Sequence, residues 1–124
     1  MCLLDKVEAW DKDVITCIAR SHCDPANPLR RDGRVAGVCG IEYCLQASAL
    51  HGALVADTRQ PVAYLVRLGD VSIAVEALDS LGETLVVRAE IVHSLPNGHS
   101  YSFGLSGADG APGLSGRATI ALVG

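Results

Sequence analysis

Aromatic residues are scarce in this sequence, and so are the features that mark several classes of protein. One Trp, one Phe and three Tyr occur among 124 residues, so Val, Leu, Ile and Ala must fill any core. The five cysteines are odd in number and include no C-x-x-C spacing, which argues against a disulfide framework and a tetrahedral metal site. We therefore expect no metal and a reducing, cytoplasmic location.

Long apolar runs and an excess of positive charge are also missing. No basic-then-apolar leader opens the sequence, and no apolar run reaches the roughly 18 residues that cross a bilayer. The formal net charge is −4, so the chain has no overall attraction for nucleic acid or anionic lipid. We expect a soluble protein with neither a nucleic-acid nor a membrane partner.

The composition that is present suits one globular unit. Apolar residues make up 49% of the chain and charged residues 19%, which supports a buried core and excludes a disordered chain. A chain of this length is close to the commonest domain size. We expect residues 1–124 to form a single domain.

The first half of the chain predicts a hairpin, a loop and a helix. Two β-branched stretches around the turn 11–13 predict a hairpin over 3–20. Residues 21–34 are dense in Pro, Gly, Asn and Asp, which predicts a long irregular loop of the kind that is usually functional. Residues 38–56 are rich in Ala and Leu and apolar nearly all round, which predicts one buried helix.

The second half of the chain predicts strands. Apolar residues alternate in four groups, and the turn signals between them are short enough for antiparallel neighbours. A hairpin, a long loop, one buried helix and four further strands indicate an α+β architecture, in which a curved antiparallel sheet wraps one central helix. This is the hotdog arrangement. The predicted inward positions on the strands are Val71, Ile73, Val75, Leu85, Val87, Ala89, Ile91, Tyr101, Phe103, Leu105, Ala118, Ile120 and Leu122.

Two segments resemble a known family. Residues 37–46 (GVCGIEYCLQ) are similar to the start of the central helix in β-hydroxyacyl-acyl-carrier-protein dehydratases, where a Gly precedes the catalytic acid by five residues and a Gln follows it by four. Residues 21–33 match the Ser-His-x-Asp-Pro-x-Asn-Pro-Leu-Arg-Arg-Asp-Gly loop of the aryl-polyene and polyketide-like pathway subgroup. Weaker similarities at 3–7 and 81–85 extend the resemblance over nearly the whole chain. The loop is longer than the usual family loop, and Ala36 stands where the family has Pro.

The resemblance implies removal of water from a β-hydroxyacyl thioester on acyl carrier protein, without a cofactor. His22 can take the α proton near neutral pH. Glu42, in an apolar environment that disfavours its charged form, can protonate the departing hydroxyl group. Backbone N–H groups at Gly37 and Val38 would stabilise the thioester oxygen, and Gly37 would allow its close approach. Gln46, on the same helix face as Glu42, would orient the carboxyl group.

Partners follow from the same resemblance. In the family the two catalytic residues meet across a dimer interface, so we expect a homodimer or a heteromer with another hotdog subunit. Arg30, Arg31 and Arg34 form the densest positive cluster of an acidic chain and are candidates to dock an acidic carrier protein or its phosphopantetheine phosphate, or a coenzyme A analogue. A hotdog thioesterase, and a weakly active or non-catalytic subunit of a heteromeric dehydratase, are the alternative functions.

Each candidate residue also has a simpler interpretation. His22 could cap a turn beside Asp24, and Glu42 could form an ion pair with Arg34 at the helix start. Gln46 could serve only in subunit contacts, and the arginines could be solvated. Cys23 is a poor candidate for a nucleophile, because no third group orients it. The remaining histidines, at 51, 93 and 99, are expected at the surface or the edge of the core.

Overall fold

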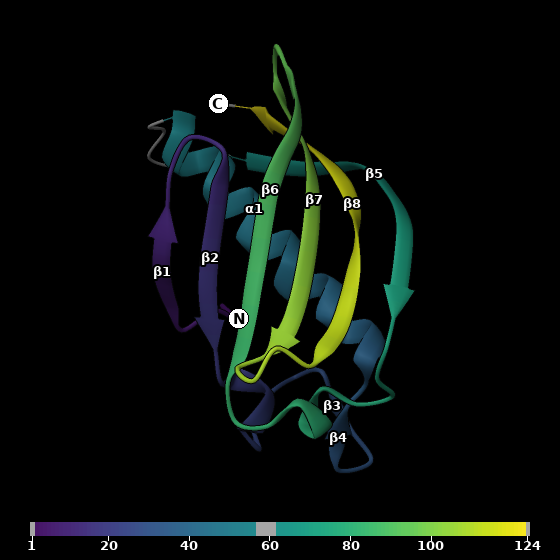
Figure 1. The fold of residues 1–124 in the computed structure, drawn as a ribbon. Helices are drawn as coiled ribbons and strands as arrows, with labels where there is room; N and C mark the ends of the chain where they lie inside the picture. Colours follow the sequence, from purple (N-terminus) through teal and green to yellow (C-terminus); the bar gives the residue numbers. More distant parts are fainter. Residues whose placement is uncertain (1, 57–61, 124) are drawn as a thin grey trace.

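The expected hotdog architecture is confirmed: a six-stranded antiparallel sheet curves around one long helix (Figure 1). The structure is a computed structural model that describes residues 2–56 and 62–123. The order of the strands in the sheet is β1-β2-β6-β7-β8-β5. Their bounds are Lys6–Trp10 for β1, Val14–Ala19 for β2, Val62–Ile73 for β5, Leu85–Leu95 for β6, Gly98–Gly107 for β7 and Pro112–Val123 for β8.

The central helix α1 spans Gly40–Ala56 and follows a 3₁₀ turn, η2, at Gly37–Cys39. It packs across the concave face of the sheet against β2, β6, β7 and β8. The predicted helix at 38–56 is therefore confirmed. With η2 it forms a stretch of 20 residues that is long and apolar enough to cross a membrane, contrary to the expectation from the sequence, but its packing is that of the core helix of the sheet. Its buried residues are Gly40, Tyr43, Cys44, Ala47, Ser48, His51 and Gly52.

The segment 21–34 is more regular than its composition predicts. It begins with a 3₁₀ turn, η1, at Ser21–Cys23, and ends in a small hairpin of β3 (Arg30–Arg31) and β4 (Arg34–Val35). Asp32 and Gly33 both have positive φ, +52° and +79°, as the tight two-residue hairpin turn requires. The expectation of a wholly irregular loop was wrong, because an Asp-Gly pair also favours this turn.

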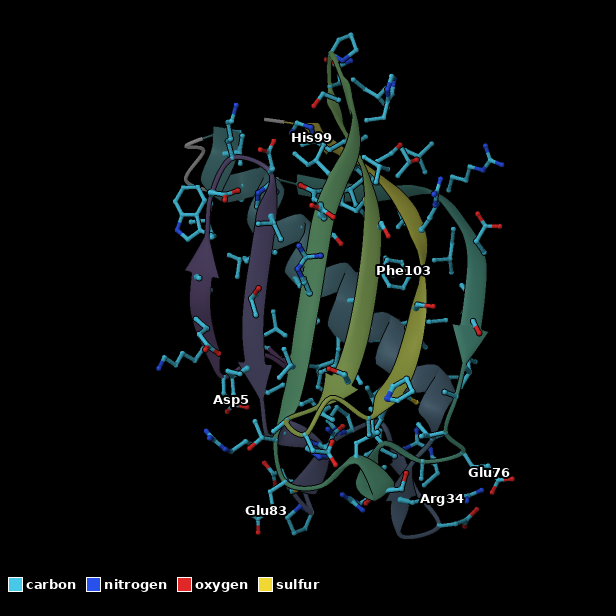
Figure 2. The ribbon with its side chains drawn as sticks, viewed as in Figure 1. Asp5, Arg34, Glu76, Glu83, His99 and Phe103 are labelled. Atoms are coloured by element: carbon cyan, nitrogen blue, oxygen red, sulfur yellow. The ribbon has the colours of Figure 1, made fainter. Side chains whose placement is uncertain are left out.

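The core lies between α1 and the inward side chains of β2, β6, β7 and β8. The alternation predicted for 85–91, 101–105 and 118–120 is confirmed, apart from Ile91, which is only partly buried. Figure 2 shows Phe103 on β7 in the middle of the sheet. Val71 and Val75 are partly buried and pack against the core, whereas the prediction was wrong for Ile73, which is exposed. All three lie at or just beyond the end of β5, which is the last strand of the sheet and has no strand on its outer side among the described residues.

A histidine that was expected near the surface is instead completely buried. His51 donates from Nε2–H to the backbone oxygen of Asp11 at 2.7 Å, and its Nδ1 accepts from the hydroxyl group of Tyr101 at 2.8 Å. His99 packs edge-on against the same tyrosine ring, and its buried Nδ1 has no hydrogen-bond partner among residues 2–56 and 62–123. Helix, hairpin and strand β7 are thus joined by one polar cluster in an otherwise aliphatic core.

This cluster predicts a loss of stability in acid. Burial lowers the pKa of His99 below its ordinary value of 6.5, and the neighbouring His51 lowers it further. Because the unfolded chain binds that proton more readily, the free energy of unfolding should fall as the pH drops from about 7 to about 5. In the variant His99→Asn the fall should be smaller, whereas His93→Asn, at an exposed position, should keep the wild-type slope. Urea unfolding across this pH range measures both, and equal slopes for all three proteins would contradict the assignment.

Candidate active site

His22 lies in η1 and is completely buried. Its Nε2 is 2.6 Å from the backbone oxygen of Gly82, and because a carbonyl can only accept, Nε2 carries the proton. The other ring nitrogen, Nδ1, is then an unprotonated acceptor. It is buried and has no hydrogen-bond partner among residues 2–56 and 62–123. One nitrogen of this buried imidazole is thus anchored by the fold, and the other has no hydrogen bond within the described residues.

Arg30 holds the backbone around this histidine. Its guanidinium group donates to the backbone oxygens of His22 and Gly33 and pairs with Asp79 at 3.2 Å. Burial works against ionisation of Asp79, but hydrogen bonds from the Val35 N–H and from Arg30 outweigh it and hold the pKa of this carboxyl group below its usual value. The candidate role of Arg30 in carrier docking is therefore corrected: its nitrogens fix the loop, and its side chain is mostly covered.

A second set of contacts ties η1 to the central helix. The Ser21 hydroxyl group lies 2.8 Å from the hydroxyl group of Tyr43, the first large buried side chain of α1. The side-chain amide of Asn27 donates to the same tyrosine oxygen at 3.2 Å and to the backbone oxygen of Ser21 at 2.8 Å. Sequence reasoning matched Ser21 and Asn27 as letters of a motif but assigned them no role. Both side chains hold η1, and with it His22, against the helix. The sequence offered one signal for this role, namely that both residues belong to the matched motif.

The role of Gly82 in holding His22 can be tested. Its backbone oxygen accepts the hydrogen bond from the His22 ring, and its φ is +89°. A side chain strains this conformation. Gly82→Ala should lower the free energy of unfolding by about 1 to 2 kcal/mol and shift the anchor of the imidazole ring. Chemical denaturation measures the first effect, and the chemical shifts of the His22 ring nitrogens in NMR spectra measure the second.

Gly104 provides the matched control for that variant. It has no positive φ, and an added Cβ atom there would meet its nearest neighbour at an ordinary 3.8 Å. Gly104→Ala should therefore leave the imidazole shifts unchanged and alter stability by no more than about 0.5 kcal/mol. Identical spectra for wild type and Gly82→Ala would show that the glycine carbonyl does not position His22.

The helix start differs from the sequence prediction at Gly37. Its N–H group already donates to the backbone oxygen of Glu76 at 2.7 Å, and a Cβ atom would lie only 1.9 Å from the backbone oxygen of Val75. The glycine is thus needed for close packing against the segment that follows β5, and its N–H is not free to bind a substrate oxygen. Val38, the next residue, is 52% exposed, and its N–H has no acceptor within the described part of the chain.

A groove of about 490 Å³ opens beside this helix start, and Val38 lines it together with Ile73 and Val75. Arg34 lies at its rim, paired with Glu76 at 3.7 Å, and Figure 2 shows these two side chains together at the end of the molecule opposite His99. The alternative in which Arg34 neutralises Glu42 is therefore wrong. The groove combines an apolar wall with an N–H donor that has no acceptor among the described residues.

Glu42 lies in the first turn of α1 and is exposed, contrary to the expectation of a buried carboxyl group. No hydrogen bond or ion pair within the described residues joins it to His22, which is fully buried. Gln46 has a partner different from the one expected, because its Oε1 accepts from the Leu3 N–H at 2.7 Å. The chain by itself therefore does not assemble the predicted acid and base.

Among the remaining candidates, Arg31 and Arg34 are exposed and available to a partner. Cys23 places its Sγ 3.5 Å from the Nε2 of His22, beside a cavity of about 440 Å³ that Gly82 also lines. Burial, and next the charge of Glu83, raise the pKa of this thiol, which opposes a thiolate nucleophile.

Strand β5 presents an unpaired edge and an apolar surface. Val66 is 65% exposed, and several further large apolar residues of this strand are open to solvent within the chain. Long exposed edges of this kind are normally covered, because their N–H and C=O groups and apolar side chains would otherwise promote aggregation. The other members are Tyr64, Leu65, Leu68 and Ile73.

Comparison with protein families gives one match, to the family described as ApeP-like, ApeP dehydratase, over residues 1–106. The resemblance to hotdog dehydratases inferred from the sequence is thereby confirmed. No curated protein matches the chain.

Solved structures agree on the fold. The dehydratase heterocomplex ApeI:P from Xenorhabdus doucetiae aligns with a TM-score of 0.81 and 20% identity over 98% of this chain and 83% of that one. A mutant thioesterase from Pseudomonas aeruginosa aligns with a TM-score of 0.70 and 20% identity over 95% and 80% of the two chains. A hypothetical thioesterase from Streptococcus pneumoniae, solved with coenzyme A, aligns with a TM-score of 0.71 and 13% identity over 96% and 85%.

Proposed function

Since this chain belongs to the ApeP-like dehydratase family, we propose that it removes water from a β-hydroxyacyl group held as a thioester on acyl carrier protein, giving the trans-2-enoyl product. The observation that carries the proposal is the buried imidazole of His22. Its Nε2–H is committed to the Gly82 carbonyl, and its Nδ1 is free. Elimination needs such a base, because the proton on the α carbon is only weakly acidic.

His22 begins the reaction by accepting the α proton at Nδ1. The C–H electron pair forms the new double bond as the C–O bond at the β carbon breaks. The imidazolium that results is stabilised because its Nε2–H remains hydrogen-bonded to the Gly82 oxygen. Arg30 keeps the loop fixed during this change through its bonds to His22, Gly33 and Asp79.

Glu42 supplies the proton that turns the departing hydroxyl group into water. Exposed in one subunit, it becomes covered when a second subunit packs on this face of the helix, and desolvation then favours the protonated acid. The site would combine His22 of one subunit with Glu42 of the other. The exposed side of α1 and the open edge of β5 support such an assembly, as does the heterocomplex formed by the similar ApeI:P dehydratase.

Val38 completes the arrangement by donating its N–H to the thioester oxygen, where negative charge develops as the α proton leaves. Arg31 and Arg34, which are exposed near this groove, suit the acidic surface of a carrier protein. The coenzyme A found in the similar Streptococcus pneumoniae thioesterase supports a thioester on a phosphopantetheine arm as the ligand class. The reaction requires no cofactor.

The test is an assay of the purified full chain with a β-hydroxyacyl carrier protein, analysed by mass spectrometry. Enoyl product from the chain alone supports the dehydratase. Enoyl product only after a second hotdog subunit is added assigns the chain to a heteromeric dehydratase. Release of the free hydroxy acid instead contradicts dehydration and supports a hotdog thioesterase, in which the exposed Glu42 would activate water, an alternative favoured by the thioesterases of similar fold.

A further inference from the structure

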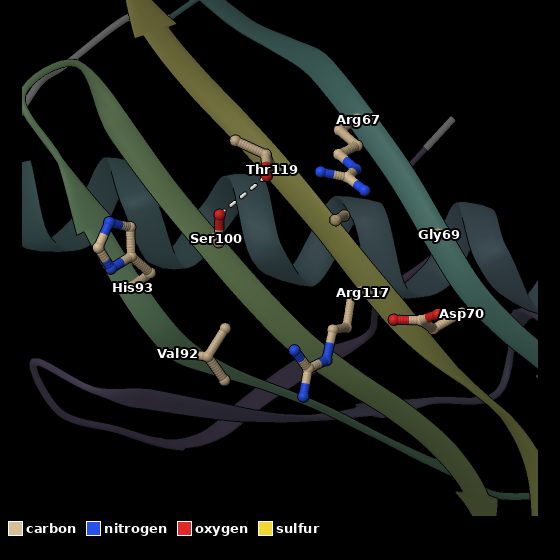
Figure 3. A pocket seen from close by; sticks show the side chains of 9 residues that line it. Arg67, Gly69, Asp70, Val92, His93, Ser100, Arg117 and Thr119 are labelled. Atoms are coloured by element: carbon tan, nitrogen blue, oxygen red, sulfur yellow. Dashed lines mark hydrogen bonds between the residues drawn. The ribbon is translucent and has the colours of Figure 1, made fainter.

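The outer face of the sheet, opposite α1, carries a third cavity, which the proposed reaction does not use. Its volume is about 360 Å³, and it lies over β5, β6, β7 and β8 (Figure 3). Its floor is formed in part by the hydroxyl groups of Ser100 and Thr119, which lie 2.8 Å apart on neighbouring strands.

Three nitrogen-bearing side chains surround the hydroxyl pair. Arg67 comes from β5, Arg117 from β8 and His93 from β6, and Figure 3 shows them on different sides of Ser100 and Thr119. The register of the sheet explains the arrangement: Arg67 pairs with Thr119, and Arg117 lies two residues before that threonine on the same face. Residues from three strands that are distant in the sequence thus line one cavity.

Neither arginine has an ion-pair partner in the part of the chain that the structure describes. No carboxylate of the described residues lies within ion-pair distance of Arg67 or Arg117, although Asp70 also lines the cavity. Arg88, on the same face of the sheet, is by contrast paired with Glu90 at 3.5 Å. Two guanidinium groups without an ion pair among the described residues line the same cavity, and an anion bound there would be attracted by both.

We propose that this cavity binds the phosphate group of a small molecule. The two guanidinium groups and His93 provide charged or polar N–H donors from two sides, and the hydroxyl groups of Ser100 and Thr119 provide short donors from the floor. Asp70, at the edge of the same cavity, repels the anion. A phosphate group occupies only part of the space, so the remainder of a phosphorylated metabolite fits beside it.

The test is an NMR titration of the isotopically labelled full chain with sodium phosphate, with sodium chloride at equal ionic strength as the reference. We expect saturable shifts of the backbone amides of Ser100 and Thr119. Arg67→Gln and Arg117→Gln should each weaken phosphate binding by about fivefold to tenfold, because each removes charged hydrogen bonds from a partly exposed site. Asp70→Asn should strengthen binding by about twofold to fivefold, because it removes the opposing charge.

Arg88→Gln is the matched control, since it removes an arginine from the same face without touching the cavity. It should leave the phosphate affinity unchanged. Shifts that do not saturate, or an equal loss in Arg88→Gln, would overturn the proposal in favour of general attraction of anions. Glycerol phosphate separates the two sources of the ligand: tighter binding than inorganic phosphate indicates a phosphorylated metabolite, and equal binding indicates phosphate itself. Dehydration of a carrier substrate is measured separately, so failure here leaves the proposed function intact.

Discussion

His22→Ala should lower the rate of dehydration by about 10²-fold to 10⁴-fold, because it removes the proposed base. Among the described residues, this is the buried imidazole whose Nε2 is bonded to a backbone carbonyl and whose Nδ1 has no partner. Glu42→Gln should cause a loss of similar size, since an amide cannot protonate the departing hydroxyl group. Production of the enoyl thioester under single-turnover conditions, in whichever assembly proves active, measures both losses. The variants are to be compared at equal occupancy by substrate.

Structural damage would imitate the first loss but not the second. His22 is buried and bonded to Gly82, so the thermal stability of the His22→Ala variant must also be measured. Glu42 is exposed in the subunit, and its replacement by Gln removes no contact within the described residues. Glu8→Gln, at an exposed position of β1, is the control for loss of a carboxylate and should retain full activity. Full activity of Glu42→Gln would exclude this carboxyl group as the acid.

Mixing the two inactive variants should restore activity if the chain acts as a homodimer. Each mixed dimer then has one site with both residues intact and one site with both changed, so random exchange of subunits should recover about a quarter of the wild-type rate. The separate variants should stay inactive at the same concentrations. Co-expression with two different affinity tags, followed by double purification, isolates the mixed dimer, in which the rate per dimer should be about half that of wild type.

Failure to recover activity would have a definite meaning. If His22 and Glu42 of one site came from the same chain, no dimer formed from these two variants would contain an intact site, and activity would not return. The matched control is a mixture of wild type with the double variant His22→Ala, Glu42→Gln, whose mixed dimers should contain no intact site. After random exchange this control should keep about a quarter of the wild-type rate, all of it from wild-type dimers. Retention of about half of the rate would place both residues of a site in one chain and contradict the arrangement across the interface.

Local sequence determined much of the fold. Alternation over 85–91, 101–105 and 118–120 predicted strands, since side chains on a strand point in opposite directions in turn. The Ala- and Leu-rich stretch at 38–56 predicted α1 almost to its ends. Asp32-Gly33 favours a hairpin turn, but the prolines that precede it led to the prediction of an irregular loop. Each of these features depends on residues close together in the chain, which is why sequence patterns report them.

The sequence also predicted a role for His22, through a long motif, but only the tertiary structure decided which atoms its ring contacts. The anchor at Gly82 comes from 60 residues further along the chain, and the tyrosine that braces the loop comes from the helix. The roles predicted for Gly37 and Arg30 were corrected for the same reason, because both residues contact distant segments of the chain. The space beside Gly37 is filled by the backbone of Val75, and the charge of Arg30 is met by Asp79. Sequence motifs and the spacing of apolar residues predict the strands and helices and which side chains face inward. The partner of each polar atom, by contrast, depends on contacts between distant segments. Those contacts form only when the sheet closes around the helix.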